Sequence, residues 1–175
     1  MAILEKYYEE RCDIPSDINE HLPVLKRYAE DCNHITEMGV RSVVSTWAFL
    51  DSNPEQLTSI DIEDCPIDLA RDLASKAGIK FKFIKGDTTQ LDIEETDLLF
   101  IDTWHVYEQL KTEFKLHSNK AKKYIILHDT TTFGDVGESA SKLVIDPVTG
   151  GMQLIPRKDR KSTRLNSSHT DISRM

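Results

Sequence analysis

Five short runs of apolar and β-branched residues recur through the first three quarters of the chain. The runs are HITEM (34–38), LTSIDI (57–62), KFKFIK (80–85), DLLFID (97–102) and KYIILHD (123–129). Runs of this length and composition predict β-strands. The last two are nearly continuous in apolar residues, which is typical of strands buried on both faces of a sheet.

The segments between these runs have helical character. Four helices are predicted, over residues 17–33, 44–52, 65–78 and 105–121. Asp17 is the predicted N-cap of the first helix, with Glu20 completing a capping box. Gly78 stands at the end of the third, where glycine commonly terminates a helix.

Strands that alternate with helices through short connections indicate a parallel sheet built from right-handed βαβ units. We therefore predict an α/β fold over residues 1–156. It would be a single Rossmann-like domain, with a doubly wound, mostly parallel sheet in a three-layer α/β/α arrangement. The C-terminal strands are expected to be incomplete or atypical. Residues 142–156 form either a hairpin around a Gly150-Gly151 turn or the junction with foreign sequence, and both alternatives stay open.

Residues 157–175 differ in composition from the rest of the chain. They carry a net charge of +4, against −12 for residues 1–156, and their few apolar residues show no period. Such a composition predicts a disordered tail, either a non-native extension or a solvated natural one. We expect the natural C-terminus of the domain to be missing.

The overall composition restricts the function classes. Hydrophobic residues make up 39% of the 175 residues and charged residues 30%, as in ordinary globular proteins. The formal net charge of −8 disfavours nucleic acid as a partner. Without a membrane-length apolar run or a signal-peptide core, the chain is expected to be cytoplasmic and not bound to a membrane. The three cysteines share no CxxC spacing, so neither a zinc knuckle nor a disulfide framework is supported.

Acidic residues stand at the end of every predicted strand. The first run ends in Glu37, and the others run into Asp61, Asp87, Asp102 and Asp129. In an open parallel sheet, ligands bind outside the carboxyl ends of the strands, near the point where the strand order reverses. One aspartate at a strand end is weak evidence, because aspartate commonly ends strands and caps helices. Acids at all five ends favour a cationic or metal-bearing ligand.

The loop after the first strand argues against a phosphate ligand. Its sequence, GVRSVV (39–44), has a single glycine, and the chain has no GxxxxGK[ST] motif. An ATP site and an NAD-dependent oxidoreductase are therefore disfavoured. Asp61 follows Gly39 by 22 residues, close to the spacing that brings an acid to a ribose. Ribose recognition beside negative charge fits S-adenosylmethionine, whose sulfonium and ammonium groups are positive.

Three motifs resemble the class I S-adenosylmethionine-dependent methyltransferases. EMGVRSVVSTW (37–47) resembles motif I of a bacterial and phage branch whose loop is E-hydrophobic-G-V-R-S-G-V-S-T. FIDTWHVY (100–107) is similar to that branch's FIDG-x-H-x-Y segment, and LHDT (127–130) to its H-D-T. The catechol O-methyltransferase group has a similar order of strand-end acids. Val43 stands where the family has a glycine, and we expect it to crowd the cofactor loop.

The resemblance implies roles for the matching residues in cofactor binding. Glu37 and Gly39 would line the methionine end of S-adenosylmethionine. Asp61 would bind the ribose, although an aspartate there also suits the cap of the next helix. Asp87 and Thr88 would lie by the adenine.

The resemblance also implies a catalytic centre that contains a metal. Asp102 and Asp129 would bind Mg²⁺, with Thr130 or His128 as a further ligand, and Asp102 would also lie beside the cofactor. His105, three residues after Asp102, is the expected general base, because an imidazole has an ordinary pKa near neutrality, and Asp102 is also expected to be catalytic. The structural alternatives are carboxylates bonded to loop amides and histidines with purely structural hydrogen bonds.

The expected function is therefore metal-assisted O-methylation of a small hydroxylated acceptor such as a sugar. The alternative is a truncated, non-catalytic Rossmann-like module that binds S-adenosylmethionine weakly or not at all. The partner is expected to be a small molecule, and a homo-oligomer is left open.

Overall fold

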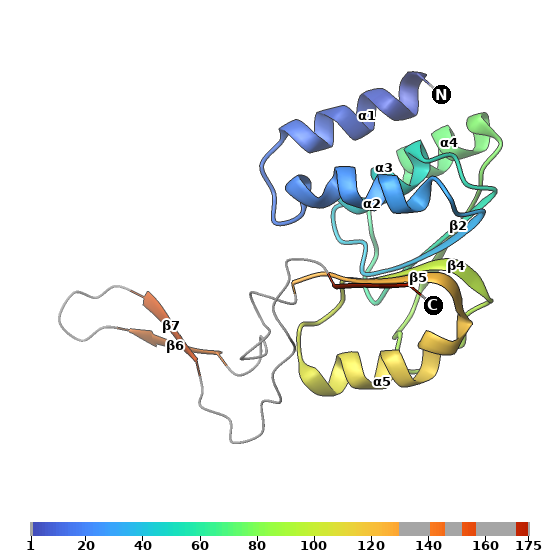
Figure 1. Cartoon of the computed structure of the whole chain (residues 1–175). Helices are drawn as coiled ribbons and strands as arrows, with labels where there is room; N and C mark the ends of the chain where they lie inside the picture. The colour runs from blue at the N-terminus through green and yellow to red at the C-terminus, as the bar shows by residue number, and fades with distance from the viewer. Residues whose placement is uncertain (1, 130–140, 146–151, 157–170, 175) are drawn as a thin grey trace.

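A computed structural model describes residues 2–129, 141–145, 152–156 and 171–174 of the chain. Five parallel strands form the body of one sheet (Figure 1): β1 (His34–Met38), β2 (Gln56–Asp61), β3 (Lys80–Lys85), β4 (Thr96–Ile101) and β5 (Ala121–Leu127). The strand order is β3-β2-β1-β4-β5-β8, where β8 is Asp171–Arg174, so the order reverses between β1 and β4. The predicted doubly wound, mostly parallel sheet is confirmed.

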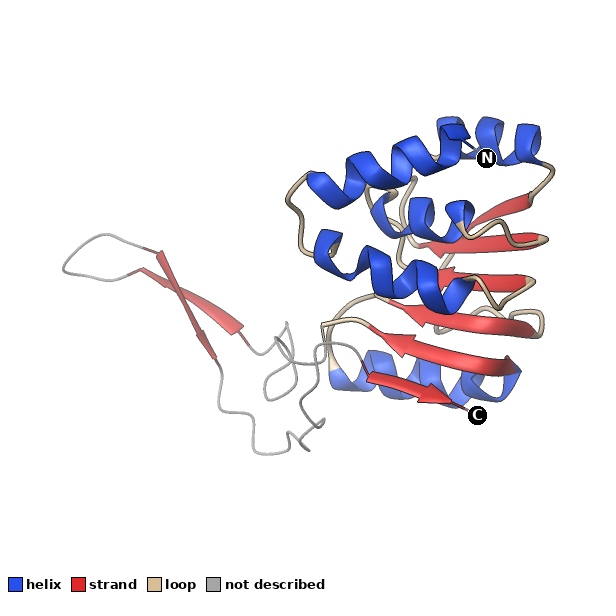
Figure 2. Ribbon diagram, turned by 45° about the horizontal axis from the view of Figure 1, so that its top comes forward, coloured by secondary structure: helices blue, strands red, loops and turns tan. Residues whose placement is uncertain are grey.

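Helices cover both faces of this sheet. Figures 1 and 2 show α1–α4 on one face and α5 on the other, which confirms the three-layer arrangement. The helices are α1 (Ala2–Asp13), α2 (Leu22–Ala29), α3 (Val44–Asp51), α4 (Asp68–Ala77) and α5 (Tyr107–His117), with short 3₁₀ turns η1 (Asn19–His21) and η2 (Ser118–Lys120). None of the described helices has the length and apolar character needed to cross a membrane.

Alternate side chains of the strands form the two cores. In β4, Leu98 and Phe100 belong to the larger core under α1–α4, whereas Leu99 and Ile101 belong to the smaller core on the side of α5. Both sets are buried almost completely, so β4 is apolar on both faces, as its nearly continuous run predicts. The edge strand β3 differs, because KFKFIK alternates lysines with apolar residues and stays partly exposed.

The predicted capping box at Asp17 does not form. Ser16 makes the reciprocal pair instead: its Oγ accepts the backbone N–H of Asn19 at 2.9 Å, and the Asn19 side chain accepts the N–H of Ser16 at 3.0 Å. The first turn begins at Asn19, and Ile18 before it provides no side-chain cap. The carboxylate of Asp17 instead pairs with Arg41 at 2.7 Å. The predicted helix over 17–33 is correspondingly shorter, divided into η1 and α2.

The described C-terminal residues form three short strands. β6 (Ser141–Ile145) pairs with β7 (Met152–Pro156) in antiparallel fashion, as the hairpin alternative predicts, while the Gly150-Gly151 turn lies outside the described residues. β8 (Asp171–Arg174) adds to the sheet beside β5, antiparallel to it. The predicted disordered tail over residues 157–175 and the domain boundary at residue 156 stay predictions.

Gly39 brings the ends of β1 and β4 into direct backbone contact. Its φ is +89°, and a Cβ there would lie 1.9 Å from the carbonyl oxygen of Asp102. The N–H of Gly39 donates to Ile60 at 2.9 Å, and the N–H of Asp102 donates to Met38 at 2.8 Å. No side chain larger than hydrogen fits between these two chain ends.

Gly39→Ala should destabilise the protein on the order of 4 kcal/mol, because left-handed strain is joined by a steric clash with β4. Gly78→Ala is the matched control, since Gly78 has a similar φ of +80° but open space around its Cβ position. The control should lose only the stability that left-handed strain costs an alanine, about 1–2 kcal/mol. Urea unfolding of both variants measures the difference, and equal losses would contradict the proposed close approach.

Candidate functional site

A small cavity lies at the carboxyl ends of β1 and β4, where the strand order reverses. The loop after β1 forms most of its wall, and Asp102 closes it from β4. The lining residues are Asp17, Ile18, Gly39, Val40, Arg41, Ser42, Val44, Ser45 and Asp102. The position is the one expected for a ligand in an open α/β sheet.

The loop after β1 has an unusual backbone. Arg41 and Val43 have φ values of 44° and 64°, a left-handed conformation that is rare for a β-branched residue. The Val43 side chain is buried in the larger core and does not line the cavity. The Val43 side chain therefore does not narrow this cavity, and its effect on the loop is backbone strain.

Asp61 holds this strained loop in place. Its Oδ2 accepts the N–H groups of Val40 at 2.7 Å and Arg41 at 3.0 Å, and its Oδ1 accepts that of Glu63 at 2.9 Å. Burial raises the pKa of Asp61, but these backbone donors outweigh it and keep the pKa below its ordinary value. The Asp61 carboxylate, which the sequence predicts to bind the ribose, thus also holds the loop that forms the cavity wall.

Glu37 lies in the interior, among β1, β2 and α3. It is fully buried, and its carboxylate accepts hydrogen bonds from the hydroxyls of Ser45 at 2.5 Å, Thr46 at 2.9 Å and Ser59 at 2.6 Å. Burial raises the pKa of Glu37 to about 7, although the three hydroxyls oppose the shift. Glu37 therefore ties β1 to β2 and α3, and its predicted contact with a cofactor stays a prediction.

The raised pKa of Glu37 makes stability fall as the pH rises. Between pH 4.5 and about 7, the unfolded state has lost this proton while the folded state keeps it. We expect the free energy of unfolding to fall by about 3 kcal/mol across this window, and Glu37→Gln to remove that part of the fall. Glu9→Gln, on the exposed surface of α1, is the control. If the free energy of unfolding changed with pH in the same way for the wild type and Glu37→Gln, the Glu37 carboxyl would not be held protonated in the folded state.

The predicted adenine residues belong to a second polar network. Asp87 accepts hydrogen bonds from the backbone N–H and hydroxyl of Thr89, at 2.8 and 2.7 Å. Thr88 is buried and donates to Glu113 of α5, a fully buried carboxylate that also accepts from Thr103 at 2.8 Å. Glu113 thus connects the loops after β3 and β4, a role the sequence analysis missed because a glutamate inside an amphipathic helix has no signal of its own.

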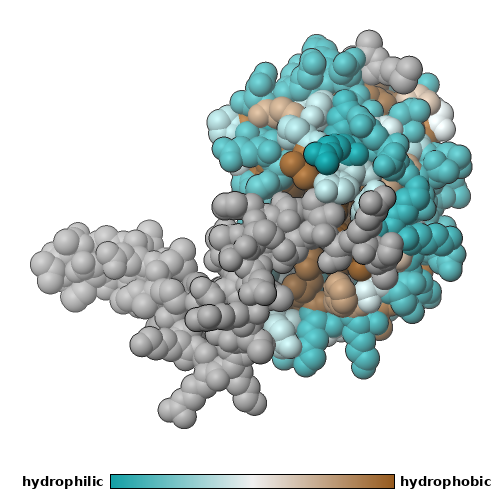
Figure 3. All heavy atoms as spheres, viewed as in Figure 1, coloured by the Kyte–Doolittle hydropathy of each residue, from teal (hydrophilic) through white to brown (hydrophobic). Residues whose placement is uncertain are grey.

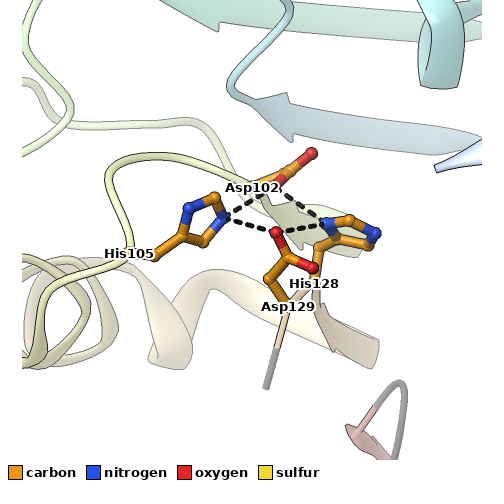
Figure 4. A group of neighbouring side chains, drawn as sticks. All are labelled: Asp102, His105, His128 and Asp129. Atoms are coloured by element: carbon orange, nitrogen blue, oxygen red, sulfur yellow. Dashed lines mark hydrogen bonds and ion pairs between the residues drawn. The ribbon is translucent and has the colours of Figure 1, made fainter. Parts of the chain in front are cut away.

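Four side chains converge at the ends of β4 and β5: Asp102, His105, His128 and Asp129 (Figure 4). Asp102 Oδ1 lies 3.1 Å from both His105 Nε2 and His128 Nδ1. Asp129 Oδ2 lies 3.5 Å from His105 Nε2 and 3.6 Å from His128 Nδ1. One ligand atom from each residue lies within 4.8 Å of the others.

The histidines determine the electrostatics of this cluster. Burial raises the pKa of Asp102, but the hydrogen bonds from His105 and His128 dominate and lower it to about 2. Burial lowers the pKa of His128, yet the hydrogen bond to Asp102 leaves it above its ordinary value. Asp102 is therefore an anion that stabilises positive charge on either imidazole.

The structure brings together Asp102, Asp129 and His105 as predicted, and Thr130 lies outside the described residues. His128 is a full member of the cluster, whereas the sequence offered it only as an alternative ligand. Two imidazole nitrogens among four donors do not match the all-oxygen surroundings that Mg²⁺ prefers.

Comparisons with known proteins bear on the fold. No protein-family model and no curated protein matches the sequence. Solved structures do match. This chain has a Rossmann-like methyltransferase fold.

Three of the matching structures illustrate this Rossmann-like methyltransferase fold. A provisionally named caffeoyl-CoA O-methyltransferase from Staphylococcus aureus is 18% identical, with a TM-score of 0.53 over 76% of this chain and 67% of its own. The N-methyltransferase NodS from Bradyrhizobium japonicum is 16% identical, with a TM-score of 0.51 over 73% and 84%. The 1,6-didemethyltoxoflavin-N1-methyltransferase from Burkholderia thailandensis, solved with its substrate and S-adenosylhomocysteine, is 14% identical, with a TM-score of 0.54 over 90% and 69%.

Proposed function

We propose that the chain is an S-adenosylmethionine-dependent methyltransferase that acts on a small hydroxylated acceptor, a sugar being the class that the resembling branch suggests. The observation that carries the proposal is the cavity between the loop after β1 and Asp102, at the point where the strand order reverses. The toxoflavin methyltransferase with the same fold was solved with S-adenosylhomocysteine, the demethylated form of this cofactor.

The charges at the rim of the cavity suit the amino-acid end of S-adenosylmethionine. Asp17 and Arg41 form an exposed ion pair at 2.7 Å, and both line the cavity. They offer one carboxylate and one guanidinium to the ammonium and carboxylate of a methionine moiety. Asp102 would face the positive sulfonium from the other wall.

The chain's own residues prepare the loop for such a ligand. Gly39 permits the close approach of β1 to β4, and Asp61 fixes the N–H groups of Val40 and Arg41. S-adenosylmethionine supplies an electrophilic methyl group, and its displacement depends mainly on positioning of the two reactants, which contributes about 7–11 kcal/mol when orientation is good. A rigid loop is what that positioning needs.

His105 would remove the acceptor's proton. Its Nε2 lies 3.1 Å from the Asp102 carboxylate, which stabilises the imidazolium formed when His105 takes up a proton. Neighbouring Trp104 has 57% of its surface exposed, and such an aromatic face beside the base suits a ring-shaped acceptor. Mg²⁺ assistance stays a prediction, and no step is assigned to it because the donor set does not fit that ion.

Calorimetry of the whole chain with S-adenosylmethionine should give micromolar affinity. Asp61→Ala should weaken binding at least tenfold, because it frees two N–H groups of the cavity wall and removes the predicted ribose contact. Asp68→Ala, which removes an exposed aspartate of α4, should bind as the wild type does. Melting curves verify that the variants are folded. No binding by the wild type would support the alternative of a non-catalytic module.

Turnover is measured by release of S-adenosylhomocysteine against a panel of sugars and other small hydroxylated compounds. His105→Gln should lower turnover roughly 100- to 10,000-fold, the usual contribution of a general base, and leave cofactor affinity unchanged. His34→Gln is the matched control, because His34 lies at the amino end of β1, on the opposite edge of the sheet. Wild-type turnover in His105→Gln would contradict the assigned role.

A further inference from the structure

We infer that Asp102, His105, His128 and Asp129 form a binding site for a divalent transition ion of the Zn²⁺ type, in preference to Mg²⁺. The inference concerns the two imidazoles, which the sequence analysis assigned to a general base and to an alternative ligand. It does not depend on the cofactor site.

The four donors come from parts of the fold that are fixed by the sheet. The N–H of Asp102 donates to Met38 of β1, and the N–H of His128 donates to Ile101 of β4 at 3.1 Å. His105 follows in the loop before α5, and Asp129 directly after His128. The cluster therefore needs little rearrangement of the backbone to bind an ion.

The orientation of each ring selects its ligating nitrogen. His128 packs edge-on against Phe100 and His21, and its Nδ1 faces Asp102. His105 presents Nε2 to both carboxylates. Figure 4 shows these two nitrogens and the two carboxylates pointing into the same small volume. The side chains of Asp102, His105 and Asp129 are 17–20% exposed, whereas that of His128 is 3% exposed, which leaves a path for an ion on one side.

The chemistry of the donors distinguishes the candidate ions. Mg²⁺ prefers oxygen ligands and retains several waters, whereas imidazole suits Zn²⁺ and its neighbours in the first transition row. Two carboxylates also balance the charge of a divalent ion. Tetrahedral ligands around Zn²⁺ stand about 3.3 Å apart, given bonds of about 2.0–2.1 Å. The four aspartate–histidine pairs, at 3.1 to 3.6 Å, are already near that spacing, and all four ligand atoms lie within 4.8 Å of one another.

One consequence rests on the proposed function. An ion bound through His105 Nε2 would remove that ring from proton transfer, because the lone pair of Nε2 would then be held by the ion and the other nitrogen, Nδ1, would carry the ring's hydrogen. Zn²⁺ should therefore lower methyl transfer.

The test measures ion binding to the whole chain directly. Calorimetry gives the affinities for Zn²⁺ and Mg²⁺, and visible absorption reports the ligands around bound Co²⁺. We expect Zn²⁺ to bind at least roughly 100-fold more tightly than Mg²⁺. Co²⁺ should give an intense visible band typical of four-coordinate nitrogen and oxygen ligation, without the sulfur-to-cobalt band that the three cysteines would cause.

Variants then assign the ligands. His128→Ala and His105→Ala should each weaken Zn²⁺ binding 10- to 100-fold and reduce the Co²⁺ band, while His34→Ala leaves both unchanged. His128→Glu, which replaces a nitrogen with an oxygen donor, should weaken Zn²⁺ binding and strengthen Mg²⁺ binding. Two histidine variants are used so that a folding failure in one leaves the other informative.

Equal affinity for Zn²⁺ and Mg²⁺ in the wild type, or unchanged Zn²⁺ affinity in both histidine variants, would overturn the inference. These measurements use no S-adenosylmethionine. Failure of the methyltransferase proposal therefore leaves their outcome unaffected, and intact methyl transfer in a chain that does not bind Zn²⁺ would refute the ion site alone.

Discussion

The contact between Gly39 and the backbone of Asp102 is the constraint on which the site depends. Because no Cβ separates them, the ends of β1 and β4 meet at the point where the strand order reverses. This contact places the loop after β1 on one side of the cavity and the Asp102 cluster on the other. A larger residue at position 39 would separate both halves of the site at once.

The strand-end acids share an edge but differ in function. Glu37 and Asp61 are occupied by the protein itself, the first by three hydroxyls and the second by three backbone N–H groups. Asp102 and Asp129 instead face histidines in a partly exposed cluster. Most of the described surface in the view of Figure 3 is hydrophilic. Two of the strand-end acids are thus engaged by hydroxyl and backbone donors that hold the strands and the loop beside the cavity, whereas the other two face histidines.

The sequence predicted the fold closely because its signals are local. Two strands, 34–38 and 80–85, agree with the predicted bounds at every residue, and the other three are shifted by one or two residues at both ends. The capping pair was misplaced because Ser16 and Asp17 are both good capping residues. Only the folded chain, in which Arg41 reaches Asp17, decides between them.

The site was harder to predict because its contacts join distant segments. The hydroxyls around Glu37 come from β2 and α3 and meet only in the folded protein. Successive strand residues normally point to opposite faces, which argues against His128 and Asp129 in one cluster. The left-handed φ of 56° at Asp129 ends the extended geometry, and the two side chains then share a side. The sequence has no signal for that turn.

The proposed function requires one edge of the sheet to bind the adenosyl donor through the loop after β1 and the strand-end acids. Amide NMR spectra recorded during a titration with S-adenosylhomocysteine locate the bound ligand residue by residue. We expect shifts at residues 39–45, 61–63 and 102–105, with none at His34, Lys80 or Thr96 on the amino edge. Shifts confined to the amino edge, or a spectrum that does not change, would contradict it.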